Sequence, residues 1–161
     1  MHRVGQLVAH VRARVDPVEE AFVQRVLQPR AHALFATMPI ADRRHGLDVA
    51  ERLLAQGQDD PDLLAAALLH DAAKGHRMRL WHRVTGVLLE ALAPSILRRL
   101  ARRDHESWRH PFHLYLHHEG MSADLVDAAG CSPRVGGFIR GVGEDADASM
   151  LRALKAADDA S

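Results

Sequence analysis

The sequence has few of the residues that stabilise small extracellular proteins or build β-sheets. It has one cysteine among 161 residues, Cys131, so it cannot form an internal disulfide, and this favours a reducing cytoplasm over an oxidising compartment. Aromatic residues make up only 4% of the chain. β-Branched residues do not alternate with polar ones over any useful length, so no strand is predicted. These absences exclude a disulfide-stabilised fold and argue against a sheet.

Net charge and long apolar runs are also missing. Twenty-one basic and 21 acidic residues cancel, which gives no electrostatic reason to expect nucleic acid or a membrane surface as a partner. The longest strongly apolar run, 63–69, is too short to span a bilayer. The opening residues MHRVGQ lack the apolar core of a signal peptide. We therefore expect a soluble, cytoplasmic protein.

The composition that is present is typical of a helical globular domain. Apolar residues make up 47% and charged residues 26% of the chain, and Leu, Ala and Arg, which dominate, favour helices. The length and the absence of a repeat or linker predict one all-α, single-domain helical bundle over residues 1–161. We divide it into an N-terminal helical part, 1–39, and a motif-bearing core, 40–161. The N-terminal part could also pair two copies, so a homodimer stays open.

Periodic apolar residues and capping signals divide the chain into helices. Asp16-Pro17 and Asp60-Pro61 each combine an N-cap with a proline at the first helical position. We expect Gly75 to close the helix that starts at Pro61, and its run 63–69 is apolar on all sides, which places it in the centre of the fold. The other expected helices cover residues 3–14, 17–28, 31–37, 40–56, 80–92, 94–102, 111–129, 133–140 and 147–159.

Histidine is abundant, with 12 in the sequence. His70 and Asp71 are adjacent at the end of the most apolar helix, where a charged carboxylate is costly unless a partner compensates it. Because neighbouring residues on a helix point about 100° apart, one ion beside the helix can contact both. The alternative is a capping carboxylate beside a core histidine, and the pair alone does not decide between the two.

Helical periodicity distinguishes two adjacent aspartates near the end of the sequence. Asp158 shares one helical face with Leu151 and Leu154, so we expect it to point inward. Asp159 lies four residues after Lys155, which is the spacing of an ion pair on the solvent side. An inward carboxylate on an apolar face needs a cation or strong hydrogen-bond donors.

His45 lies near the start of the preceding helix, above Val49 at the edge of its apolar stripe, although a half-exposed helix-start histidine would show the same pattern. Together His45, His70, Asp71 and Asp158 offer two imidazoles and two carboxylates. This set suits one divalent transition metal, Fe, Mn, Co, Ni or Zn, with Mg as a further option. A bound metal in turn indicates hydrolytic chemistry at phosphate.

Three segments resemble a known family. LLHDAAK, residues 68–74, is similar to the signature segment of the HD-domain superfamily of metal-dependent phosphohydrolases. HGLDVA, residues 45–50, resembles its first histidine helix, and LKAADDA, residues 154–160, resembles its last helix, whose aspartate follows an alanine. The resemblance implies an all-helical fold that binds one divalent metal. The implied ligands are His45, His70, Asp71 and Asp158.

Some members of this superfamily have extra histidines for a second metal, one of them four residues before Gly-Ala. His118 precedes Ser122-Ala123 at that spacing. Where such members have another histidine, three residues after an isoleucine, this chain has Val142, so the resemblance favours one metal. Three further histidines are auxiliary candidates for the site, His118, His82 and His117. The alternative for each is a position near the metal without binding it, in the pocket or on the surface.

Basic residues flank the motif. Lys74 lies three residues after Asp71 and leans toward the same side of the helix, so we expect it to hold a substrate phosphate and to stabilise charge in the transition state. Arg44, next to His45, and Arg77, in the loop that follows, are further phosphate candidates. A solvated run of charges is the alternative for the arginines.

These observations predict a metal-dependent phosphohydrolase acting on a small phosphorylated substrate, such as a nucleotide. Asp71 would orient or deprotonate the attacking water as well as bind the metal, and Lys74 would act on the phosphate. The competing prediction is a catalytically silent HD-type module that binds a nucleotide or regulates a partner.

Overall fold

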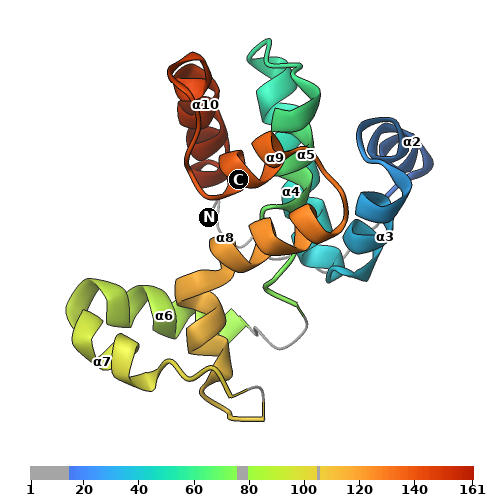
Figure 1. Ribbon diagram of the computed structural model, residues 1–161. Coiled ribbons are helices and arrows are strands. Elements are labelled where there is room, and N and C mark those ends of the chain that lie inside the picture. The colour runs from blue at the N-terminus through green and yellow to red at the C-terminus, as the bar shows by residue number, and fades with distance from the viewer. Residues whose placement is uncertain (1–14, 76–79, 105) are drawn as a thin grey trace, which may run out of the picture.

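The computed structural model describes residues 15–75, 80–104 and 106–161, and within these ranges the chain is helical and has no strand, which confirms the all-α prediction. No helix in these ranges is both long enough and apolar enough to cross a membrane. The predicted helix 3–14 lies outside the described residues. In chain order the elements are α2 (Pro17–Val26), α3 (Pro29–Thr37), α4 (Ile40–Ala55), α5 (Pro61–Leu69), α6 (Leu80–Leu92), α7 (Pro94–Leu100), α8 (His110–Ala128), α9 (Pro133–Ile139), the 3₁₀ turn η1 (Asp145–Asp147) and α10 (Ala148–Asp159) (Figure 1).

Local signals set the helix starts, as predicted. The Asp16 carboxylate accepts hydrogen bonds from the amides of Val18 and Glu19, and the Glu19 carboxylate accepts one from the Asp16 amide, which completes a capping box on α2. The Asp60 carboxylate accepts hydrogen bonds from the amides of the second and third residues of α5. Both helices place proline at their first position, where no amide hydrogen is needed.

Helix α5 is the centre of the hydrophobic core. Every residue from Leu63 to Leu69 is buried, and α5 packs against α2, α4, α9 and α10. Figure 1 shows α10 on one side of α4 and α5, and α2 and α3 on the other. Complete burial of a leucine contributes about 1.5–3 kcal/mol, so the run that is apolar on all sides fixes α5 in the middle of the fold.

Helices α6, α7 and the first part of α8 reach away from this core (Figure 1). Gly86 lets α6 pack closely on α8, because a Cβ at this position would lie 2.7 Å from Cδ2 of Tyr115. The Tyr115 hydroxyl donates a hydrogen bond back to the Glu90 carboxylate of α6, at 2.6 Å. The later part of α8 returns to the core and packs against α9.

The prediction that the central helix runs to Gly75 is wrong. Helix α5 ends at Leu69, and the residues that follow form turns. In a continuing helix the Ala73 amide would donate to the carbonyl of Leu69. It donates instead to Oγ of Ser122 on α8, at 3.0 Å, a partner 49 residues further along the chain. The His70-Asp71 pair therefore lies at the junction between α5 and these turns.

Arg134 on α9 joins the N-terminal ends of α5 and α10. Its guanidinium donates hydrogen bonds to Asp60, the N-cap of α5, and to Asp147, the N-cap of α10, each at 2.7 Å. The same group lies 4.8 Å from the centre of the Phe138 ring. The two helices therefore start from a shared anchor, and each ends near the cluster described below.

Candidate metal centre

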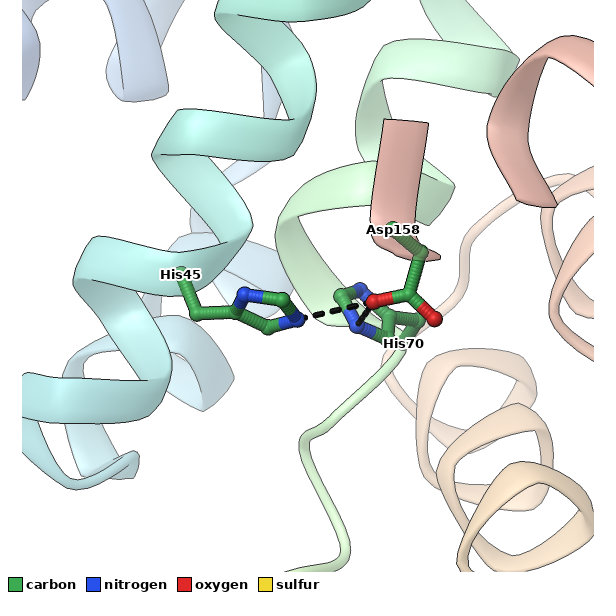
Figure 2. A group of neighbouring side chains, drawn as sticks. All are labelled: His45, His70 and Asp158. Carbon is green, nitrogen blue, oxygen red and sulfur yellow. Dashed lines mark hydrogen bonds and ion pairs between the residues drawn. The ribbon is translucent and has the colours of Figure 1, made fainter. Parts of the chain in front are cut away.

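Three side chains from distant parts of the chain meet at one point, from α4, from the end of α5 and from α10 (Figure 2). Nε2 of His45 lies 2.8 Å from Oδ1 of Asp158, and Nε2 of His70 lies 3.4 Å from the same oxygen. The two imidazole rings meet edge to face, with centroids 5.1 Å apart. One ligand atom from each residue lies within 4.8 Å of the others. We call these three residues the cluster.

The backbone fixes which nitrogen of His70 faces the cluster. Nδ1 lies 2.9 Å from the carbonyl oxygen of Ala67, and because a carbonyl only accepts, Nδ1 carries the hydrogen. The lone pair of the neutral ring is then on Nε2, which faces Asp158. Nε2 is buried and makes no hydrogen bond with any described residue. Histidines that bind metals are commonly oriented in this way by a carbonyl group.

Asp71 is completely buried beside the cluster. Its Oδ2 accepts a hydrogen bond from Nζ of Lys74 at 2.7 Å, and its Oδ1 lies 3.5 Å from Nε2 of His70. The Lys74 ammonium is also 2.6 Å from Oδ1, but within the described part of the chain Oδ1 makes no hydrogen bond of acceptable geometry. The turn after α5 therefore presents two buried ligand atoms, Nε2 and Oδ1, side by side.

Charge outweighs burial in setting the pKa values of these groups. Burial raises the pKa of Asp158, but its close contacts with His45 and His70 hold it well below its usual range. Burial also raises the pKa of Asp71. The charges of His70 and Lys74 lower it by more, so the pKa of Asp71 lies below its usual value. Burial lowers the pKa of His70, but the contact with Asp158 and the charge of Asp71 raise it overall. Both carboxylates are therefore ionised at neutral pH and attract positive charge to this point.

Gly46 allows α4 and α5 to approach closely beside the cluster. A Cβ at this position would lie 2.9 Å from the carbonyl oxygen of Leu68 and 3.1 Å from that of Ala67. The Ala67 carbonyl is the group that orients His70. A side chain at position 46 would therefore separate the helices at the point where His45 and His70 meet.

His118, from α8, stands on the other side of Asp71. Its Nε2 lies 3.9 Å from Oδ1 of Asp71. Its Nδ1 donates a hydrogen bond to the carbonyl of Tyr115 at 3.0 Å, so the lone pair of the neutral ring is on Nε2. Burial and the charge of Lys74 lower the pKa of His118, which keeps the ring neutral at pH 7.

The other two auxiliary histidines lie apart from the three-residue cluster. His82 is buried on α6, where its ring meets the edge of the Phe112 ring at a centroid distance of 5.7 Å. His117 is exposed on α8, and its ring centroid lies 4.5 Å from that of His113. Because successive residues on a helix point about 100° apart, His117 does not share the direction of its neighbour His118.

The predicted phosphate ligands are placed differently from one another. Lys74 lies at the cluster through Asp71. Arg44 instead forms ion pairs with Glu19, with Asp48 at 2.9 Å and with Glu51 at 3.4 Å. Three carboxylates contact this guanidinium, so Arg44 joins α2 to α4, and its role as a phosphate ligand stays a prediction. Arg77 lies outside the described residues.

A cavity of about 390 Å³ opens beside the cluster. It runs from His70 and Asp158 along α10, and its lining includes apolar residues of α9 and α10 together with Arg152 and Lys155. Neither cation was predicted to line the site. Helical periodicity could have found them, because they lie six and three residues before Asp158 and flank the face that carries it.

Comparison with known proteins adds no relative. No family model matches the chain, and no curated protein or solved structure matches it. The resemblance to the HD-domain superfamily therefore rests on segments 45–50, 68–74 and 154–160 alone, and the function is proposed from the site itself.

Proposed function

We propose that this protein is a metal-dependent phosphohydrolase of small phosphoesters, with one divalent metal ion held by His45, His70, Asp71 and Asp158. The observation that carries the proposal is the pair of buried atoms without a hydrogen bond, His70 Nε2 and Asp71 Oδ1, which lie 3.5 Å apart beside the other two ligands. Buried polar atoms rarely stay unsatisfied. A cation at this point would satisfy both atoms.

The residue types fit a transition metal. Two imidazoles and two carboxylates suit Fe, Mn, Co, Ni or Zn better than Mg, which prefers oxygen ligands alone. The surrounding contacts support this ligand set, because the Ala67 carbonyl orients His70 and Lys74 holds Asp71.

A divalent ion bound here would polarise a phosphoryl oxygen and lower the pKa of a water molecule. The side chains of the protein position the water and the phosphate on which that chemistry would act. Because its pKa is lowered, the Asp71 carboxylate orients a water as a hydrogen-bond acceptor better than it removes a proton. The Lys74 ammonium lies against this carboxylate and has further N–H donors for an oxygen of the phosphate.

His118 is the residue best placed to accept the proton. It is neutral at pH 7, its Nε2 lone pair faces the site, and Nε2 lies 3.9 Å from Oδ1 of Asp71. A water hydrogen-bonded to Asp71 would be within reach of this nitrogen. We therefore assign orientation of the water to Asp71 and removal of its proton to His118.

The first experiment is elemental analysis of untagged protein purified without a metal column or chelator. We expect about one equivalent of a divalent transition metal, and a loss of that metal in His70→Ala and Asp71→Ala. His117→Ala is the matched control, because it removes a histidine outside the cluster. Release of phosphate from phosphomonoesters and phosphodiesters is then measured with each metal.

The outcomes separate the proposed function from its alternative. Metal together with phosphate release that Asp71→Ala abolishes supports the hydrolase. Nucleotide binding without phosphate release by any metal form favours the silent binding module. If Asp71→Ala keeps full metal content and activity, the assignment of this site is wrong.

A further inference from the structure

The cavity beside the cluster is larger than a phosphate group requires. At about 390 Å³ it falls in the range of sites that enclose a whole small molecule. Its apolar wall includes Phe138 and Ile139 of α9 and Leu151 and Leu154 of α10. Such a wall suits a ring or a hydrocarbon part of a ligand, attached to a phosphate at the cluster.

Two cations on α10, Arg152 and Lys155, alternate along the helix with the leucines of this wall. Lys155 is one helical turn before Asp158 and Arg152 nearly two, a rise of about 4.5 and 9 Å along the helix axis. Both side chains are exposed and both line the cavity. Lys155 has only a 3.7 Å contact with the exposed Asp159, and Arg152 forms no ion pair with any described residue.

The other charges that line the cavity are carboxylates. Asp158 is occupied by the two histidines of the cluster. Glu119, on α8, forms no ion pair with Arg152 or Lys155 among the described residues. The two cations are therefore available to a ligand, and they lie at a separation from the cluster that one small molecule can span.

We infer that Arg152 and Lys155 form a second anion-binding subsite. This inference rests on the proposed function, and it specifies the substrate as a phosphoester with a second acidic group, a carboxylate or another phosphate. The apolar or ring-shaped part between the two groups would lie against Phe138 and Leu151. Arg152 and Lys155 then select the substrate, while the cluster acts on its phosphate.

Phosphonates test this subsite without any reaction, because a phosphohydrolase does not cleave their carbon–phosphorus bond. Binding of 4-carboxyphenylphosphonate and of its neutral 4-carbamoyl analogue to the intact protein is measured by titration calorimetry in buffer containing Mn²⁺. We expect the carboxylate to bind about three- to tenfold more tightly, since exposed charge pairs contribute modestly. Arg152→Gln/Lys155→Gln should remove this preference.

The matched control is Arg98→Gln/Arg99→Gln, which removes the same charge from exposed positions on α7 and should keep the preference. Equal binding of the two compounds, binding of neither, or a preference that survives Arg152→Gln/Lys155→Gln overturns the subsite, whether or not the protein hydrolyses phosphoesters. A preference that depends on these two residues, together with no hydrolysis by any metal form, retains the subsite and rejects the proposed hydrolase.

Discussion

Gly46 lies directly against the carbonyl oxygen of Leu68, so closely that a Cβ would be 2.9 Å from it. Overpacking in Gly46→Ala should therefore lower the free energy of unfolding by about 1–3 kcal/mol. The higher helix propensity of alanine should offset about 1 kcal/mol of this loss. It should also weaken metal binding about 10- to 100-fold, the usual effect of displacing the groups that orient a ligand. Urea unfolding and metal titration measure the two effects.

Gly120→Ala is the control for this substitution. Gly120 lies inside α8, and a Cβ there would meet nothing within 4 Å. We expect this change to stabilise the protein by up to about 1 kcal/mol, through helix propensity alone. A similar gain in Gly46→Ala would contradict the close packing of α4 on α5.

Ser122→Ala should loosen the turn that carries His70 and Asp71. It removes the acceptor of the Ala73 amide hydrogen bond, so we expect the free energy of unfolding to fall by about 1–3 kcal/mol. Phosphate release should fall with it, because Lys74 lies on the same turn. Ser132→Ala is the control, because its Oγ makes no hydrogen bond with any described residue, and it should change stability by no more than about 0.5 kcal/mol.

His118→Gln separates a proton acceptor from a metal ligand. We expect the metal content to stay at the wild-type level while kcat falls about 10²- to 10⁴-fold, the usual contribution of a general base. Elemental analysis and kcat are measured on the same preparation, with His117→Gln as the control on the adjacent exposed position. Loss of metal in His118→Gln would instead make His118 a ligand.

The stability of the protein should decrease in acid partly through Asp60. Burial raises the pKa of Asp60, but hydrogen bonds from Arg134 and from the start of α5 lower it below its usual 3.8. The unfolded chain therefore binds the proton more tightly, and this stabilisation is complete above pH 3.8 and is lost as the pH falls below it. We expect Asp60→Asn to reduce the loss of unfolding free energy in acid by about 1 kcal/mol or less, because the ion pair between Asp60 and Arg134 is partly exposed.

A double-mutant cycle assigns this effect to one pair. Arg134→Gln should also weaken the pH dependence of the free energy of unfolding, measured by urea denaturation between about pH 6 and pH 3. Adding Asp60→Asn to Arg134→Gln should then change the pH dependence little. Fully additive effects would show that the two side chains act independently.

The single tyrosine reports on the packing of α6 against α8. Burial and the hydrogen bond to Glu90 raise the pKa of Tyr115 to about 12. Absorbance titration of the folded protein should give this value, whereas the protein unfolded in urea should titrate near the usual value of about 10. Glu90→Gln should lower the folded value. A folded value near 10 would contradict the contact between Tyr115 and Glu90.

Features with local causes were predictable from the sequence. Asp16 and Asp60 mark the starts of α2 and α5 because an N-cap binds amides two and three residues away. The exposed position of Asp159 and its contact with Lys155 follow the helical period, as predicted. Periodicity also predicted that Asp158 faces inward; its carboxylate contacts His45 and His70, while 44% of its side chain is exposed.

Features with distant causes were not predictable from one sequence. The end of α5 depends on Ser122, which lies 49 residues after Ala73. Arg44 resembled a free cation beside His45, but Glu19 binds it from 25 residues away. The cavity forms where the end of α5, α8, α9 and α10 come together, so no local pattern indicates it.

The parallel course of α5 and α10 from their shared anchor at Arg134 has an electrostatic consequence. The peptide dipoles of a helix sum to about half a negative charge at its C-terminal end, and both helices end beside the cluster. Asp71 and Asp158 add two negative charges there, which Lys74 and His70 offset only in part. The backbone itself thus favours a cation and repels a phosphate, so we expect ligands to bind in a fixed order, metal first and phosphoester second.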